Sequence, residues 1–274
     1  MKKVLSLLLA LVMCLSLCAC GGGDQNPEEQ PTEEQPTEEQ PTEIKEEIWV
    51  IISVDSINDK GIVFTRTENV YNEDGELARR GSGFYKNKLY DDDFVDCTYE
   101  YEFDEQNNLT EMRVFDTFPD VYTFNSDGYI TEITSYYGDG RQSGHKLFEY
   151  DEAGRLVTSI FYMDSGKLDC KILYKYREDG TCEEHSCYEE DDVLLYITEC
   201  DELGRPYFTK YYNAKAPTYS YKYVYDDNGN LTEVFQYFGN SNDEQSHYRY
   251  TYRLIQVTPL QKKIIEAKNK LIDY

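Results

Sequence analysis

The sequence predicts an all-β protein in which antiparallel hairpins stack into an elongated sheet, with an amphipathic helix capping the C-terminal end. Three observations support this fold class. A turn motif returns about every 25 residues between residues 71 and 231. Tyrosine, which favours strands, occurs 27 times in the 274 residues. The last residues, in contrast, place apolar side chains at helical spacing.

The motif has the chemistry of a tight hairpin. Its clearest copy is Tyr-Asp-Glu-Ala-Gly-Arg-Leu, from Tyr150 to Leu156. Asp151 suits the first position of a type I turn, and Gly154 suits the fourth, where it can take the left-handed conformation of a bulge. This register sets Tyr150 opposite Leu156 on one face, and Asp151 opposite Arg155. An aromatic–aliphatic pair across two strands contributes about 0.2–1 kcal/mol.

Seven copies of the motif align on this turn. From the second copy onward, the turn residues are 21, 26, 26, 24 and 25 positions apart. The aligned positions are Tyr71/Gly75/Leu77, Phe103/Asn107/Leu109, Phe124/Gly128/Ile130, Tyr150/Gly154/Leu156, Tyr176/Gly180/Cys182, Cys200/Gly204/Pro206 and Tyr225/Gly229/Leu231. Irregular turns separate the copies, so each repeat should contain two strands. Leu231 and Val234 have opposite parity, so either one of them faces away or a bulge lies between them.

The core Tyr-Asp-x-x-Gly-Arg-Leu resembles the YD repeat of the RHS family, over about residues 71–252. The resemblance implies antiparallel strands. In that family, long arrays spiral into a hollow shell around a cargo. Seven copies are expected to be too few to close a shell, and no toxin-sized domain follows them. We therefore expect the strand architecture here without the activity of enclosing a cargo.

Both ends of the array have features of caps. Residues 48–54 and 62–70 are predicted to be lead-in strands. Thr258 and Pro259 form an N-cap followed by proline at the first helical position. An amphipathic helix is then predicted over about 259–272, with Leu260, Ile264, Ile265, Lys268, Leu271 and Ile272 at helical spacing. We expect this helix to cover an open end of the sheet rather than to bind a partner.

The N-terminus predicts export and lipid anchoring. Two lysines precede a short apolar run, as in a secretory signal peptide, and the run is too short for a comfortable membrane span. Residues 17–20, Leu-Cys-Ala-Cys, resemble the lipobox of bacterial lipoproteins. The resemblance implies cleavage after residue 19 and lipid attachment at Cys20. Fatty-acyl chains would then hold the protein on the outer face of the cell membrane.

The expected domain organisation follows from changes in composition. Residues 1–19 are the predicted signal peptide, and residues 20–43 form a predicted disordered tether, because from residue 24 onward they are only Pro, Thr, Glu, Gln, Asn and Asp. The β domain is expected over 44–256, and the C-terminal helix over 257–274. The 20 tether residues from residue 24 could extend roughly 60 Å.

Charge excludes several classes of partner. The chain has 27 basic and 53 acidic residues, a net charge of −26. Such a surface repels phosphate backbones and anionic headgroups, so we expect no nucleic-acid partner and no direct membrane contact by the folded part. Membrane association is expected only through the N-terminal lipid. No small-molecule cofactor is indicated.

Few residues suggest chemistry. His145, His185 and His247 lack metal-ligand spacing, apart from a loose grouping of His185 with Cys182 and Cys187, so no metal site is predicted. No nucleophile elbow, P-loop or zinc-protease motif occurs, so no catalytic residues are predicted. Cys182 and Cys200 are expected to face each other across adjacent strands. They form either a disulfide, as export permits, or two small apolar thiols.

The sequence therefore favours a non-catalytic, surface-displayed lipoprotein whose tyrosine-rich sheet binds a protein or a glycan, with the ligand-binding residues unknown. A structural or spacer protein of the envelope is the first alternative, and an enzyme of unrecognised type is the second. A concave row of aromatic side chains open to a ligand would favour binding. Aromatic side chains covered by the next repeat would favour a scaffold.

Overall fold

The structure, a computed structural model, describes residues 45–84, 88–212, 219–238 and 244–271. The predicted signal peptide, the tether and the lipid-attachment residue Cys20 lie outside these ranges. The strands are β1 (Glu46–Asn58), β2 (Val63–Tyr71), β3 (Leu77–Phe84), β4 (Phe94–Asp96), β5 (Thr98–Phe103), β6 (Leu109–Phe115), β7 (Asp120–Phe124), β8 (Ile130–Tyr136), β9 (Gln142–Tyr150), β10 (Leu156–Met163), β11 (Leu168–Tyr176), β12 (Cys182–Glu189), β13 (Val193–Cys200), β14 (Pro206–Tyr211), β15 (Tyr219–Tyr225), β16 (Leu231–Phe238) and β17 (Glu244–Val257). One α-helix follows, α1 (Pro259–Asn269), and two short 3-10 turns cover Asp91–Asp93 and Glu190–Asp192.

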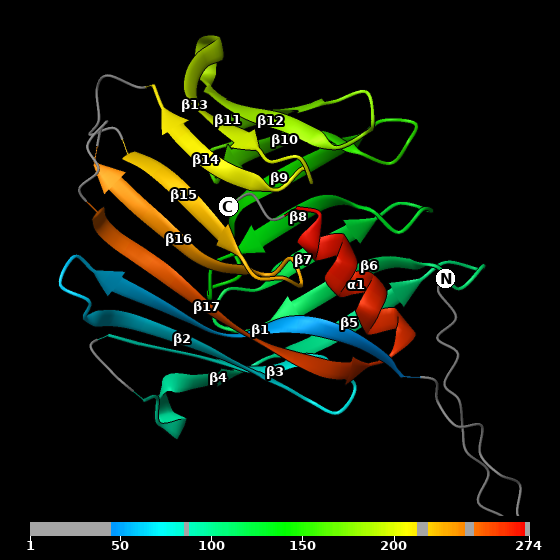
Figure 1. Cartoon of the computed structure of the whole chain (residues 1–274). Helices are drawn as coiled ribbons and strands as arrows, with labels where there is room; N and C mark the ends of the chain where they lie inside the picture. The colour runs from blue at the N-terminus through cyan, green and yellow to red at the C-terminus, as the bar shows by residue number, and fades with distance from the viewer. Residues whose placement is uncertain (1–44, 85–87, 213–218, 239–243, 272–274) are drawn as a thin grey trace, which may run out of the picture. The chain divides into compact units, whose positions relative to one another are not determined.

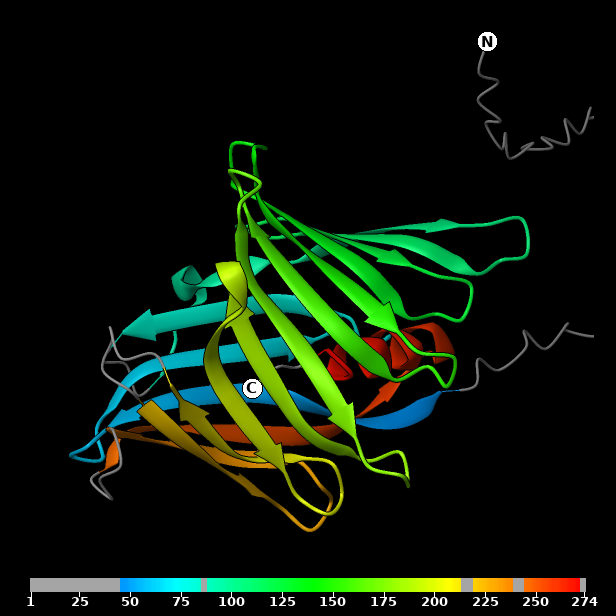
Figure 2. The same cartoon turned by 90° about the horizontal axis from the view of Figure 1, so that it is seen from above.

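All 17 strands belong to one antiparallel sheet that nearly closes into a barrel (Figures 1 and 2). Neighbours in the sheet follow chain order, and β1 lies between β17 and β2. The weak point is between β3 and β6, where β4 pairs with β3, β5 pairs with β6, and Cys97 separates the two short strands. The Cys97 N–H still donates to the carbonyl of Ala78, at 2.8 Å.

The all-β architecture of antiparallel hairpins is confirmed, but the expected elongated sheet with open ends is not, because the sheet nearly closes into a barrel (Figures 1 and 2). The physical reason is the length of the first and last strands. β1 has 13 residues and β17 has 14, and they pair from Glu46↔Val257 to Asn58↔Ser246. The sheet twist brings them together, and their long ladder removes the two edges that an elongated sheet would expose. The predicted lead-in strands are present as β1 and β2.

The hairpin prediction is confirmed in all seven copies. The aromatic and apolar positions of each motif are partners across the ladder, as in Tyr150↔Leu156. Every turn residue has a positive φ, from 65° at Asn107 to 87° at Gly75 and Gly180. In the clearest copy, Gly154 N–H donates to the Asp151 carbonyl, and Asp151 N–H donates to the Arg155 carbonyl, both at 2.9 Å. This is a type I turn with a bulge.

A second bulge, beyond the turn of the seventh copy, places Leu231 and Val234 on the same face of the sheet. The ladder pairs Tyr225 with Leu231 but Val224 with Glu233, so one extra residue lies between the two pairs. The bulge turns both apolar side chains inward. Leu231 and Val234 are 2% and 5% exposed and pack in one cluster with Tyr223.

The tyrosines that recur in the motif join neighbouring hairpins. Three motif tyrosines have a preceding copy with which their hydroxyl bonds. Each hydroxyl donates to the backbone carbonyl of the residue at the apolar position of that copy. These bonds are Tyr150 to Ile130 at 2.8 Å, Tyr176 to Leu156 at 2.7 Å and Tyr225 to Pro206 at 2.8 Å.

The motif arginines add a second connection between hairpins. Arg155 pairs with Asp151 of its own turn at 2.6 Å, and its guanidinium lies 4.8 Å from the ring centre of Tyr176 in the next copy. Arg205 does the same with Asp201 and Tyr225, at 2.7 and 4.4 Å. The tyrosine, aspartate and arginine of the motif thus have structural roles.

The predicted C-terminal helix is present and lies against the inner face of the sheet. Thr258 accepts the N–H of Gln261 at 3.2 Å, and Pro259 occupies the first turn. Ile264 and Ala267 are buried in a core cluster with side chains of β6 to β10. Figure 2 shows α1, in red, between those green strands and the blue and orange strands β1 and β17. Within the described ranges, no helix has the length and hydropathy that a membrane span requires.

Candidate functional site

A cavity with a volume of about 670 Å³ lies inside the sheet, beside α1. We call it the interior cavity. Its walls come from β1, β2 and β3, from β5, β6 and β7, from β16 and β17, and from α1. Ligand sites in proteins typically occupy about 300–1,000 Å³, so the space is large enough for a small organic ligand. Aromatic side chains form much of the lining: Trp49, Tyr71, Tyr99, Tyr122, Tyr250 and Tyr252.

Two tyrosine hydroxyls of this wall are held by backbone carbonyls. Tyr71 donates to the Ile51 carbonyl at 3.2 Å, and Tyr99 donates to the Leu77 carbonyl at 3.0 Å. Burial raises the pKa of both phenols, so they stay neutral hydrogen-bond donors. With their hydroxyls fixed, these side chains offer ring surface to the cavity, and their positions are set before any ligand arrives.

Two cations line the same cavity. The Lys268 ammonium lies 4.4 Å from the ring centre of Tyr122, a cation–π contact. Among the described residues, no carboxylate lies within 4.0 Å of Lys268 Nζ, the limit for an ion pair. Burial, followed by the charge of Arg80, lowers the pKa of Lys268 to about 8. Among the described residues, the Arg80 side chain has long contacts, at 4.0 Å to Asp116 and 3.4 Å to the side-chain oxygen of Asn69.

The two acids of the cavity, in contrast, have short hydrogen bonds to the wall. Asp120 accepts the hydroxyl of Ser135 at 2.6 Å. Asp116 accepts the N–H of Phe118 at 2.7 Å. The cavity therefore offers N–H donors from the lysine and the arginine, and acceptor positions on the two carboxylates.

A polar network joins α1 to the wall at one side of the cavity. The Gln261 side chain, 6% exposed, donates to the Tyr101 hydroxyl at 2.7 Å and to the Glu76 carboxylate at 3.3 Å. Tyr101 in turn donates to Glu76 at 2.7 Å. This closed set of hydrogen bonds fixes the helix register, and with it the position of Lys268 two turns further on.

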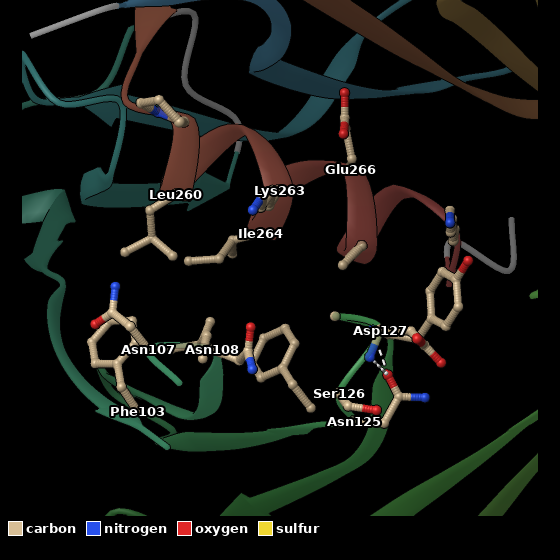
Figure 3. Close-up of a pocket in the computed structure, with 17 residues that line it drawn as sticks. Phe103, Asn107, Asn108, Asn125, Ser126, Asp127, Leu260, Lys263, Ile264 and Glu266 are labelled. Carbon is tan, nitrogen blue, oxygen red and sulfur yellow. Dashed lines mark hydrogen bonds between the residues drawn. The ribbon is translucent and has the colours of Figure 1, made fainter. Parts of the chain in front are cut away.

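A second cavity, of about 530 Å³, lies on the other side of α1, against the turns of the second and third motif copies. Figure 3 shows Leu260 and Ile264 pointing from the helix toward Asn107 and Asn108. The lining is mainly apolar, with amide groups from the turns. Charged side chains line both cavities, and the interior cavity is the better candidate site because it is larger and more of its lining is aromatic.

The predicted cysteine pair lies at a third cavity, of about 240 Å³, together with His185. The structure places Cys182 and Cys200 next to each other as thiols. Their hydrogen bond, followed by burial, raises the pKa of the Cys200 thiol. Whether they form a disulfide in the exported protein stays a prediction. They replace the apolar and tyrosine positions of neighbouring copies, and Arg177 supplies the missing connection by donating to both cysteine carbonyls, at 2.7 and 2.8 Å.

The three histidines lie apart from the interior cavity. His185 is 5% exposed, and its ring meets the ring of Tyr174 edge-on at 5.4 Å. Burial lowers the pKa of His185 to about 4. His145 stacks on Tyr162 at 4.7 Å, and His247 contacts Glu244 at 2.8 Å. Within the described residues, no group of three or more metal-ligating side chains converges.

Sequence reasoning did not single out Lys268 or Arg80. One signal was present, because Lys268 is the charged residue within the otherwise apolar stripe of the predicted helix. A lysine at that position must either extend out of the core or reach an internal space. Arg80 carried no comparable signal, since its place at the cavity depends on closure of the sheet.

Comparisons with known proteins concern the fold alone. No protein-family model matches the sequence, and a comparison with curated proteins found no match. Among solved structures, a porin-like protein from Bacteroides uniformis is similar over 74% of this chain and 98% of its own, with 14% identity and a TM-score of 0.46. A porin-like protein from Bacteroides vulgatus has the same coverages and identity, with a TM-score of 0.33.

The toxin complex TcdB2-TccC3 is also similar, over 69% of this chain and 12% of that one, with 12% identity and a TM-score of 0.27. Scores of this size describe a similar arrangement of strands and carry no functional argument. The YD-repeat resemblance remains an expectation at the level of family.

Proposed function

We propose that this protein is an extracytoplasmic lipoprotein whose β domain binds a short glycan in the interior cavity, without catalysing a reaction on it. One observation carries the proposal. A cavity of about 670 Å³ inside the nearly closed sheet combines aromatic rings with amide and charged side chains. A sugar presents C–H faces, which pack on aromatic rings, and hydroxyl groups, which need polar partners. This cavity offers both.

The shape of the site favours a glycan over a protein ligand. Folded proteins usually meet over about 800 Å² per partner, on surfaces that are accessible from outside. The aromatic and polar groups here are instead gathered between the wall and α1, in a volume that suits a small ligand or the end of a chain. The motif tyrosines Tyr150, Tyr176 and Tyr225 are instead bonded to neighbouring hairpins.

The cellular location in this proposal rests on the N-terminal sequence. The predicted signal peptide and lipobox would expose the mature protein outside the membrane, held by the lipid on Cys20. The acidic tether would then hold the binding domain away from the membrane. Replacing Cys20 with alanine should release the protein from membranes or leave it unprocessed. Unchanged processing and membrane association in Cys20→Ala would sink this part of the proposal.

A structural role is the second candidate, and a specific observation favours it. The hydroxyls of Tyr150, Tyr176 and Tyr225 all bond to the preceding copy, as expected of residues whose purpose is to stack repeats. A scaffold needs nothing more from its tyrosines. The interior cavity distinguishes the two candidates, because a scaffold gains no stability from leaving such a volume unfilled.

The test is a glycan array followed by calorimetry on the full chain in detergent micelles. Val114→Phe adds bulk within the interior cavity, whereas Val70→Phe adds the same bulk to an exposed position, 42% accessible, outside it. We expect wild type and Val70→Phe to bind the same glycan, and Val114→Phe to bind at least tenfold more weakly. Absence of any glycan ligand, or equal binding by both variants, would refute the proposal.

A further inference from the structure

Two cations, Lys268 and Arg80, and two acids, Asp116 and Asp120, line the interior cavity. The chain carries a net charge of −26, so its surface repels anions. Inside, Lys268 and Arg80 both line one cavity and act on each other strongly enough that Arg80 lowers the pKa of Lys268. Two cations brought together in this way cost free energy unless an anion lies near them.

The wall carries two acids, Asp116 and Asp120, but among the described residues neither reaches the two cations at hydrogen-bonding distance. The nearest carboxylate to Arg80 is that of Asp116, at 4.0 Å, and the Arg80 side chain is 52% accessible. Lys268 has the face of Tyr122 on one side and no carboxylate within 4.0 Å among the described residues. Asp120 is the acid that most favours the charged lysine, yet its short bond is to the Ser135 hydroxyl.

We propose that the interior cavity recognises an acidic sugar, with Lys268 and Arg80 holding its carboxylate and the aromatic wall packing against its ring. This inference rests on the proposed function and names the class of glycan. A carboxylate can accept N–H groups from both side chains at once, and the arginine fork suits two parallel bonds. The remaining hydroxyls of the sugar would meet the amide of Asn69 and the carboxylates of Asp116 and Asp120.

The acidic surface of the protein should favour acidic sugars over simple anions. The acidic exterior lowers the local concentration of all anions, so a free carboxylate gains nothing from long-range attraction. Only an anion that also packs on the aromatic wall gains enough from contact with the two cations. We therefore expect an acidic sugar to bind more tightly than either its neutral counterpart or a small carboxylate without a sugar ring.

The pH dependence follows from the groups that face Lys268. These are Arg80 on β3, Cys97 between β4 and β5, and Asp120 and Tyr122 on β7. The pKa of Lys268 is about 8 in the unliganded protein, so the amine is largely charged at pH 7 and largely neutral at pH 9. Affinity for an acidic sugar should fall over this interval, whereas affinity for a neutral sugar should not.

The experiment is a calorimetric titration of the full chain with three probes: methyl glucuronoside, methyl glucoside and propionate. The glucuronoside should bind about 10- to 100-fold more tightly than the glucoside at pH 7, the size expected of charge-assisted hydrogen bonds. Lys268→Met should remove most of this preference. Lys263→Met is the matched control on the same helix, since Lys263 is exposed and lines the other cavity, and it should keep the preference.

The outcomes separate this inference from the proposed function. If the glucoside binds as tightly as the glucuronoside, the cavity is a glycan site but the acidic preference is refuted. If propionate binds as tightly as the glucuronoside, the two cations form an anion site and the glycan assignment fails. If none of the probes binds and the glycan array is also blank, both fail. A preference that survives Lys268→Met with an unchanged melting temperature would overturn the role of Lys268.

Discussion

Burial of His185 makes the stability of this protein sensitive to mild acid. The side chain is 5% exposed, and its pKa is lowered from 6.5 to about 4 by burial. The unfolded chain therefore binds a proton more tightly than the folded one between these two values. The stability associated with the neutral imidazole is fully present above pH 6.5 and is lost as the pH falls toward 4. By linkage, the loss is about 2 kcal/mol at pH 5 and about 3 kcal/mol at pH 4.

His185→Phe removes this titration and keeps an aromatic ring beside Tyr174. The assay is urea unfolding of wild type and variant at pH 7, 5 and 4, followed by circular dichroism. The measured quantity is the change with pH in the difference between the two unfolding free energies. Carboxylates that titrate in the same range cancel in that difference, and so does any constant cost of the larger ring. Between pH 7 and pH 5, we expect the unfolding free energy of wild type to fall by about 2 kcal/mol more than that of the variant. A difference that stays constant with pH would refute the reasoning.

Three further predictions concern the repeat itself. Tyr150→Phe removes one hydroxyl bond between copies and should lower the unfolding free energy by about 1 kcal/mol; no loss in urea unfolding would contradict its structural role. Gly154→Ala should cost more than Gly128→Ala. Both residues have a positive φ, but an added Cβ would lie 2.3 Å from a tyrosine hydroxyl at Gly154 and in open space at Gly128. Equal melting temperatures for these two variants would argue against that packing. Mild oxidation should link Cys182 to Cys200, which peptide mapping and thiol counting under denaturation can establish; both thiols remaining reactive would exclude the bridge.

The hairpins could be predicted from sequence because their determinants are local. A glycine or asparagine with positive φ, an aspartate that bonds to the turn, and an aromatic–apolar pair all lie within seven residues, so Tyr150 to Leu156 specifies its own geometry. The helix could also be predicted from the sequence, since Thr258, Pro259 and the apolar spacing are local signals. These features recur in each copy and so can be checked against one another.

Closure of the sheet depends instead on residues about 200 positions apart. The pairing of β1 with β17 requires a twist accumulated over all the intervening strands, and no single motif reports it. The interior cavity could not be predicted for the same reason, because Arg80 and Lys268 line one cavity only after the sheet has curved around α1. The role of Tyr150 as a donor to Ile130 was also not evident, since it joins two copies rather than two strands of one hairpin.

The central claim is that the interior cavity is where this protein binds its ligand, and the chain contains its own reporter. Trp49 is the single tryptophan of the sequence, lines the interior cavity and is 38% exposed. Its fluorescence can be followed during titration of the full chain with methyl glucuronoside. We predict a saturable change in emission whose midpoint agrees with calorimetry and which is lost in Val114→Phe. Calorimetric binding with no change in Trp49 emission would place the ligand elsewhere and contradict the account.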